Sequence, residues 1–167
     1  VLARMDQGPK MEIKPVNLSE LVSDAVESAR AAGPGHPITL VKSDSEDEIY
    51  ALGDSNRIHQ VVANLLANAR VHTPVGTQIK VSIAQSEKEV QVAVSDNGPG
   101  LSEENREKIF ERFYRVDPSR QRTGAEGSGL GLSIVDAVMR SHGGHVSVDS
   151  KLGEGSTFTL HFPLQAI

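Results

Sequence analysis

The amino-acid sequence predicts an α+β fold, in which helices pack on one face of a mixed and mostly antiparallel sheet. Segments with apolar residues at helical spacing are interspersed with pairs of segments in which apolar and polar residues alternate singly. Short polar or glycine-containing turns join the paired segments, as is typical of antiparallel hairpins. No regular strand–helix–strand alternation runs along the chain, which argues against a doubly wound parallel sheet.

The predicted helices begin and end at recognisable signals. In the first, Asn17 or Ser19 is a candidate N-cap and Gly33 follows the last apolar residues. The second ends before Pro74, because the residue preceding a proline disfavours helical geometry. The third region, residues 102–116, follows the glycine-containing turn SDNGPG and holds one or two short helices. The predicted helical segments cover roughly 15–33, 55–72, 102–116 and 130–142.

The predicted strands are short runs rich in β-branched residues. ITLVK and EIYALG lie on either side of an acidic turn, and TQIKVSIAQS and KEVQVAVSD form a hairpin around Glu87 and Lys88. A last pair, GGHVSVDSK and GSTFTLHFP, closes the fold. The predicted strands cover roughly 38–42, 48–53, 77–86, 88–96, 143–151 and 155–163.

Length and composition exclude several classes of function. A chain of 167 residues fits one domain, and 4% aromatic residues predict a core of Val, Leu, Ile and Ala. Seventeen basic and 22 acidic residues give a net charge of −5 without a basic run, so we expect neither nucleic-acid binding nor direct membrane contact. Without cysteine there is no disulfide and no thiolate site, which suits the cytoplasm.

One predicted helix, RIHQVVANLLANARVHTP, carries a polar stripe beside a broad apolar face. Gln60, Asn64, Asn68 and His72 are four residues apart and therefore share one side of the helix. Asparagine is a mediocre helix former, and burying its amide without partners costs free energy. The stripe is either a solvated face with two incidental asparagines or the wall of a cleft. In the second case an asparagine carbonyl oxygen suits Mg²⁺, a hard cation that takes oxygen ligands.

The cluster SDNGPG follows a predicted strand, which delivers Asp96 to the rim of the sheet. Glycine tolerates a positive φ and lets a planar ligand approach the backbone closely. Asp96 is well placed there to accept a hydrogen bond from an exocyclic amine such as adenine N6. The alternative is an ordinary Asp-Asn-Gly-Pro turn after a strand.

The cluster GSGLGLS stands at a helix start, where free N–H groups and the helix dipole favour phosphate. It is neither a dinucleotide-binding fingerprint, which follows a strand directly, nor a Walker A loop, since no G-K-S or G-K-T occurs. The preceding RVDPSRQRTGAEG is basic and contains glycine. It suits a lid over a phosphate site and also a surface loop with scattered charge, and these two interpretations are compatible.

Taken together, these blocks resemble the catalytic ATP-binding domain of sensor histidine kinases, within the superfamily shared with gyrase B, Hsp90 and MutL. The match includes NLLANARVHTP, DNGPG, FERFYR, GSGLGLSIV and GEGSTF in that order, and covers roughly residues 15–165. The resemblance implies a Bergerat-type α/β sandwich for residues 15–167. Residues 1–14 would then be the end of a preceding dimerisation-domain helix and a linker.

The resemblance also implies roles for individual residues in the chemistry of ATP. Asn68 would ligate Mg²⁺ with support from Asn64, and Arg115 would approach the γ-phosphate. Asn68 and Arg115 are therefore the predicted catalytic residues. Phe110 and Phe113 would pack at the base of the lid.

Further residues would shape the nucleotide site. Asp96 would bind adenine N6, Thr157 would orient Asp96 or a bridging water, and His72 would stack on the base as a neutral ring. The remaining predicted cofactor-binding residues come from the glycine clusters. Gly98 and Gly100 would make room for the base, while the lid hinge and phosphate cradle would comprise Gly127, Gly129, Leu130 and Gly131.

The sequence departs from the family pattern at two positions. Val71 stands where a lysine or arginine is usual, and His72 stands where an aromatic residue usually stacks on adenine. Moreover, none of the six histidines lies in the H-E/D-x-R-T/N-P context of a phosphoacceptor. We therefore expect the acceptor histidine on a separate dimerisation domain.

The predicted function is thus transfer of the γ-phosphate of ATP, with Mg²⁺, to that histidine. Further expectations are a response regulator as partner of the full-length protein, a membrane-anchored parent with this domain in the cytoplasm, and a monomeric fragment. One alternative is a degenerate nucleotide-binding or partner-docking module, and another is a related protein-serine kinase. An ATPase like gyrase B or Hsp90 would need a glutamate to activate water, and HQVVANLLAN contains no acid.

Overall fold

The computed structural model describes residues 11–42, 48–111 and 131–164. No helix within these ranges is both long and apolar enough to span a bilayer. The elements are β1 (Lys14–Asn17), α2 (Leu18–Ala32), β2 (Ile38–Lys42), β3 (Tyr50–Gly53), α3 (Ser55–Val71), β4 (Ile79–Gln85), β5 (Glu89–Asp96), α4 (Glu103–Lys108), α5 (Gly131–Ser141), β6 (His145–Lys151) and β7 (Gly155–Pro163).

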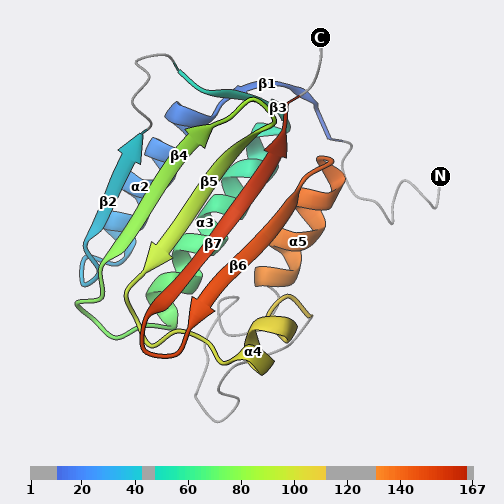
Figure 1. Ribbon diagram of the computed structural model, residues 1–167. Coiled ribbons are helices and arrows are strands. Elements are labelled where there is room, and N and C mark those ends of the chain that lie inside the picture. The colour runs from blue at the N-terminus through green and yellow to red at the C-terminus, as the bar shows by residue number, and fades with distance from the viewer. Residues whose placement is uncertain (1–10, 43–47, 112–130, 165–167) are drawn as a thin grey trace, which may run out of the picture.

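The main sheet has five strands in the order β2-β4-β5-β7-β6. β2 pairs with β4 in parallel, and the other neighbours pair antiparallel. Helices α2, α3 and α5 lie on one face of this sheet, and the other face carries no helix of the described chain (Figure 1). The predicted α+β architecture, with a mixed and mostly antiparallel sheet, is therefore confirmed.

A second, two-stranded sheet pairs β1 with β3, and the sequence did not predict it. Lys14 lies opposite Gly53, and Asn17 lies opposite Tyr50. Residues 15–17, at the start of the segment expected to hold the first helix, belong to strand β1. Of the two predicted N-cap candidates Asn17 is confirmed, because its side chain accepts from Glu20 N–H at the start of α2. The strands expected on either side of an acidic turn also lie in different sheets, because each finds its partner elsewhere in the chain.

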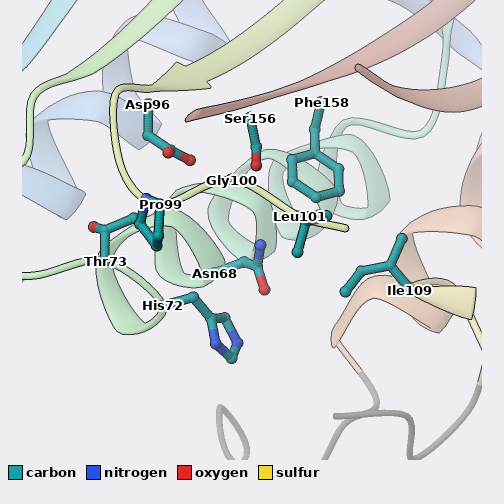
Figure 2. A pocket seen from close by; sticks show the side chains of 10 residues that line it. All are labelled: Asn68, His72, Thr73, Asp96, Pro99, Gly100, Leu101, Ile109, Ser156 and Phe158. Carbon is teal, nitrogen blue, oxygen red and sulfur yellow. The ribbon is translucent and has the colours of Figure 1, made fainter. Parts of the chain in front are cut away.

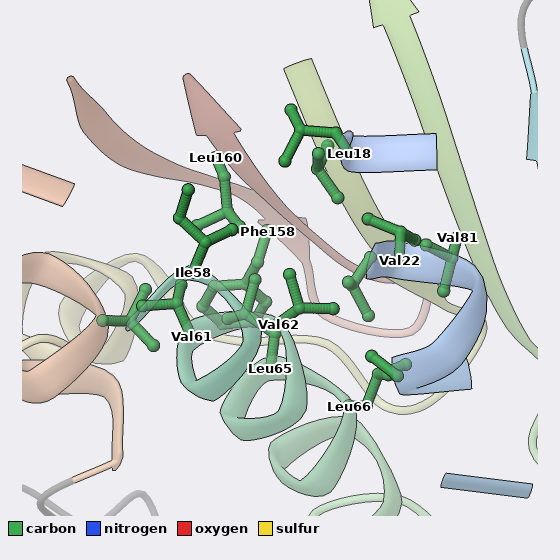
Figure 3. Packing of buried hydrophobic residues seen from close by; sticks show 14 of the residues in the cluster. Leu18, Val22, Ile58, Val61, Val62, Leu65, Leu66, Val81, Phe158 and Leu160 are labelled. Carbon is green, nitrogen blue, oxygen red and sulfur yellow. The ribbon is translucent and has the colours of Figure 1, made fainter. Parts of the chain in front are cut away.

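The core lies between the main sheet and the helices, with α3 at its centre (Figure 3). Strands β4, β5 and β7 alternate buried and more exposed residues, so one face of each meets the helices. Burying one such aliphatic side chain stabilises the fold by about 1.5–3 kcal/mol. The α3 residues Ile58, Val61, Val62, Leu65 and Leu66 are at most 1% exposed and pack in the same cluster as Phe158 and Leu160 of β7.

Both ends of α3 are capped, and this sets the position of its polar stripe. The Asp54 carboxylate accepts from Arg57 N–H, and the His72 N–H donates to the Asn68 carbonyl. The predicted end before Pro74 is therefore confirmed. The apolar face of α3 is buried in the core, which leaves Asn68 and His72 on a different side of the helix.

Candidate functional site

A cavity of about 170 Å³ lies where the C-terminal half of α3, the loop after β5, the segment around α4 and the start of β7 meet (Figure 2). These described walls enclose less than the roughly 300 Å³ at which sites for drug-sized ligands begin. They therefore suit one ring system better than a whole nucleotide. The lining residues are Asn68, His72, Thr73, Asp96, Pro99, Gly100, Leu101, Ile109, Ser156 and Phe158.

Asp96 is the last residue of β5, and it lines the cavity as the sequence predicted. Its Oδ1 accepts a hydrogen bond of 2.9 Å from Gly98 N–H. Partial burial raises the pKa of the Asp96 carboxyl, while the N–H groups of Gly98 and Ser156 oppose this rise. The cavity therefore has a partly desolvated carboxylate held in place by backbone donors.

Ser156 and Thr157 are consecutive in β7 and lie on opposite faces of the sheet. Ser156 pairs with Asp96 across β5 and β7 and lines the cavity, together with Phe158. Thr157 pairs with Ser95, and their hydroxyls are in hydrogen-bond contact on the open face. Thr157, a predicted site residue, is thus not brought to the cavity. The strand alternation in GSTF could have identified Ser156, because Phe158 must face the core.

From α3, Asn68 and His72 both line the cavity, as the polar stripe predicted. Figure 2 shows the Asn68 amide directed into it and the His72 ring near its mouth. Asn64, one turn earlier, does not line it. Its side-chain N–H instead donates to the Gly131 carbonyl at 3.4 Å, which ties α3 to the start of α5. The structure therefore places Asn64, one helical turn before Asn68, beside Gly131.

Thr73 also lines the cavity, and the sequence analysis missed it. Its hydroxyl donates to the Ala69 carbonyl at 2.6 Å. Nε2 of His36, a residue only 5% exposed, lies 3.0 Å from the same hydroxyl. Because the hydroxyl proton goes to Ala69, this contact is made with Nε2 as the donor. His36 is buried although it lies in the connection between α2 and β2. The local sequence pattern does not predict this burial, and therefore it does not predict the contact with Thr73.

The two glycines of DNGPG are needed for close backbone packing. A Cβ at Gly98 would lie 2.6 Å from the Thr73 methyl. Gly100 has a φ of +74°, and a Cβ there would lie 2.0 Å from the Lys151 carbonyl oxygen. The loop is therefore folded tightly between the end of α3 and the turn from β6 to β7, with Pro99 and Gly100 on the cavity wall.

Several predicted site residues lie outside the described chain. These are Arg115, Gly127, Gly129 and Leu130, together with Phe113. Phe110 is described, packs against the core and makes an edge-to-face contact with Phe158, with ring centroids 6.1 Å apart. Its predicted contact with the lid concerns residues outside the described ranges.

The cavity combines a polar end, apolar walls and one side-chain amide, that of Asn68. The Asp96 carboxylate and the Ser156 hydroxyl form the polar end, while Leu101, Ile109 and Phe158 form apolar walls. Within the described ranges no three histidine or acidic side chains are grouped as a metal cluster. A cation here would therefore take most of its ligands from the bound molecule and water, with Asn68 contributing one amide oxygen, a donor set that fits Mg²⁺.

Comparison with known families gives one match that covers most of the chain. Residues 53–166 match the family described as histidine kinase-, DNA gyrase B- and HSP90-like ATPases. The probable sensor histidine kinase TcrY of Mycobacterium tuberculosis is 43% identical over 164 residues, covering 98% of this chain and 34% of that protein. Sensor histidine kinase RppB of Synechocystis is 37% identical over 151 residues, covering 90% of this chain and 33% of that protein. The chain thus spans about a third of the length of these relatives.

Solved structures of similar fold come from the same group of proteins. The mycobacterial sensor histidine kinase MprB has a TM-score of 0.78 at 28% identity, covering 92% of this chain and 100% of that one. A nucleotide-free catalytic domain of histidine kinase ThkA has a TM-score of 0.75 at 28% identity, covering 92% of this chain and 98% of that one. Full-length ShkA in complex with AMPPNP has a TM-score of 0.77 at 26% identity, covering 95% of this chain and 32% of that one.

Proposed function

This chain belongs to the family of histidine kinase-, DNA gyrase B- and HSP90-like ATPases, and we propose that it is the catalytic part of a sensor histidine kinase. In this role it binds Mg-ATP and transfers the γ-phosphate to a histidine on a separate dimerisation domain. The observation that carries the proposal is the placement of Asp96, Ser156 and Asn68 around one cavity of a size that suits a purine ring. The relatives named as sensor histidine kinases support it.

The adenine would occupy the inner end of the cavity. A primary amine has two N–H donors, and Asp96 and Ser156 both have acceptor oxygens at that end. The flat apolar space between Leu101, Ile109 and Phe158 would take the ring itself. His72, near the mouth, would stack on the base from the α3 side. The structure of ShkA with AMPPNP supports an adenine nucleotide as ligand in this fold.

The phosphates would extend from the base toward Asn68 and the start of α5. Asn64 and Gly131 are joined by a hydrogen bond on that side, so their backbone and amide groups border the path. When bound, Mg²⁺ would neutralise charge on the phosphate oxygens. Asn68 would hold one position of the metal. Arg115, Gly127, Gly129 and Leu130 remain predicted phosphate and lid residues.

Little covalent chemistry falls to this domain in the transfer step. An imidazole nitrogen of the acceptor histidine attacks the γ-phosphorus, the bond to the β,γ-bridging oxygen breaks, and ADP leaves. The ring proton passes to a base on the acceptor's own domain. The side chains of this domain orient the γ-phosphate in line with the attack and exclude water.

The remainder of the system would lie in a longer protein. Residues 1–14 would connect this domain to the dimerisation domain, and a response regulator would receive the phosphoryl group. The parent would be membrane-anchored with this domain in the cytoplasm. In isolation the fragment would be a monomer.

Calorimetric titration with ATP, with and without Mg²⁺, tests the binding step, and metal-enhanced binding is expected. Phosphorylation in trans of an added dimerisation domain of the same kinase tests the transfer step. Binding without transfer would favour the degenerate module, for which Val71 is the supporting observation. Labelling of serine instead of histidine would favour a serine kinase, and rapid ATP hydrolysis alone would contradict both kinase assignments.

A further inference from the structure

Ser150, a residue with no role in the proposed chemistry so far, is buried directly behind the polar end of the cavity. It is 4% exposed and pairs with Ser156 across β6 and β7. Its hydroxyl makes three hydrogen bonds: it accepts from Leu101 N–H at 2.7 Å, donates to the Gly155 carbonyl at 2.9 Å and contacts the Ser156 hydroxyl at 2.8 Å.

These contacts determine which serine donates to the other. A hydroxyl has one proton to donate and two lone pairs to accept with. The Gly155 carbonyl can only accept, so it takes the proton of Ser150. All three contacts are satisfied when Leu101 N–H and the Ser156 hydroxyl both donate to Ser150, and buried polar groups are nearly always satisfied.

The consequence is that Ser156 turns its proton away from the cavity and its lone pairs toward it. Figure 2 shows Ser156 between Asp96 and Phe158, with its oxygen directed into the cavity. The carboxylate of Asp96 is also an acceptor. The inner end of the cavity therefore has acceptors on both strands, which favours a ligand with two N–H donors and disfavours a carbonyl oxygen at the same place.

We propose that Ser150 is a specificity-determining residue, which holds the Ser156 hydroxyl as an acceptor and so selects a 6-amino purine over a 6-oxo purine. The inference rests on the proposed ATP binding. A site built to hydrogen-bond a donor rejects an analogue that lacks it, because the buried acceptors of the site are then left unpaired. Ser150 does not touch the ligand and acts through Ser156.

The test is the ratio of affinities for Mg-ATP and Mg-ITP, which differ at the 6-amino group and the adjacent ring nitrogen. In Ser150→Ala the Ser156 hydroxyl is released and can donate to a 6-oxo group. The ATP/ITP ratio is then expected to fall by about two- to tenfold, the equivalent of one hydrogen bond. Ser156→Ala should lower the ratio as well, and the double variant should match Ser156→Ala.

Ser147→Ala is the matched control, since Ser147 lies on the same strand but contacts His161 on the open face. If Ser150→Ala does not fold, Ser150→Cys replaces it, because the somewhat larger thiol leaves no cavity but is a weak donor and acceptor. Equal losses for both nucleotides, or an additive effect in the double variant, would overturn the inference and leave ATP binding intact. Absence of ATP binding by the unaltered chain would instead refute the proposed function.

Discussion

Asp96 and Ser156 lie directly opposite each other on β5 and β7, and both side chains line the same cavity. They are 60 positions apart in the chain, and the strand pairing alone brings them together. The backbone N–H of Ser156 also opposes the rise in the pKa of Asp96. The pair therefore combines a partly buried carboxylate with a hydroxyl at the inner end of the site.

Asp96→Asn is expected to remove most of the ATP affinity. The amide places a donor group where the amine of adenine needs an acceptor, and hydrogen bonds to charged groups contribute about 1.5–3 kcal/mol, so the loss should be about tenfold or more. Calorimetric titration measures it. The control is Asp149→Asn on the exposed side of β6, and unchanged affinity in Asp96→Asn would refute the adenine assignment.

ATP binding should weaken with acidification earlier than an ordinary aspartate would predict. Burial raises the pKa of Asp96 above its usual 3.8, so the protonated, non-accepting form appears at higher pH. A raised carboxyl pKa means that the folded state binds this proton more tightly than the unfolded state does. The contribution of Asp96 to stability therefore improves as the pH falls through that pKa, while affinity drops. Titrations of the unaltered chain measure the affinity, and the difference in thermal stability between the unaltered chain and Asp96→Asn over the same pH series isolates the contribution of Asp96. The two should show these opposite trends, and parallel trends would contradict the assignment.

Asn68→Ala should abolish the enhancement of ATP binding by Mg²⁺, because the variant lacks the amide oxygen assigned to the metal. Affinity without metal should change little. Titrations with Mg²⁺ and with a chelator measure the enhancement, and Gln60→Ala, an exposed position on the same helix stripe, serves as control. An enhancement equal to that of the unaltered chain would exclude Asn68 as the ligand.

His36→Ala should reduce both stability and ATP affinity. The substitution leaves Thr73 without its buried donor, which costs about 1–3 kcal/mol in the free energy of unfolding, and it loosens a residue on the cavity wall. His36→Gln retains an N–H donor and should recover part of both losses. Denaturant unfolding and calorimetry provide the two measurements, with His59→Ala as the control on α3. A stability loss without any change in affinity would show that Thr73 does not contribute to the site.

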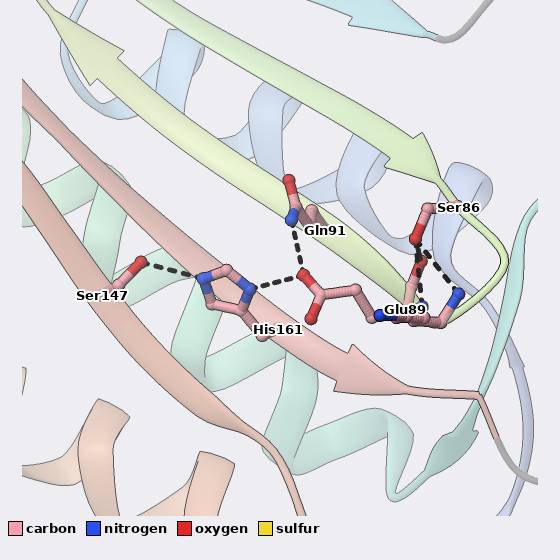
Figure 4. A network of polar contacts seen from close by, with 6 residues as sticks. Ser86, Glu89, Gln91, Ser147 and His161 are labelled. Carbon is pink, nitrogen blue, oxygen red and sulfur yellow. Dashed lines mark hydrogen bonds and ion pairs between the residues drawn. The ribbon is translucent and has the colours of Figure 1, made fainter.

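Glu89→Gln should destabilise the fold slightly, and only above acidic pH. Hydrogen bonds from Gln91 and His161 on the open face of the sheet lower the pKa of Glu89 (Figure 4). Because its pKa is lowered in the folded state, Glu89 stabilises the fold at pH values above its usual pKa of 4.5. This stabilisation is lost as the pH falls through the lowered pKa. The expected cost at neutral pH is about 0.2–1 kcal/mol, and it should vanish in acid. Thermal melts at several pH values check this against Glu87→Gln, in the exposed β4–β5 turn. A cost that is independent of pH would contradict it.

The sequence by itself determined the parts of this protein that depend on local periodicity. Helical spacing placed Asn68 and His72 on one stripe of α3, and the strand before DNGPG placed Asp96 at the rim of the sheet. Asn68 and His72 of the stripe line the cavity together with the carboxylate, whereas Gln60 and Asn64 of the same stripe do not. These predictions succeeded because the repeat of a helix or strand fixes the direction of each side chain relative to its neighbours.

Only the tertiary structure decided which segments pair and which side chains meet behind the cavity wall. The β1–β3 sheet, the parallel pairing of β2 with β4 and the buried contact of His36 with Thr73 all join distant segments. The register of β7 with β5 and β6 decides that Ser156, rather than Thr157, lines the cavity and that Ser150 lies behind Ser156. Such contacts arise when separate elements bury their apolar faces against one another, and no local pattern encodes which partners they find.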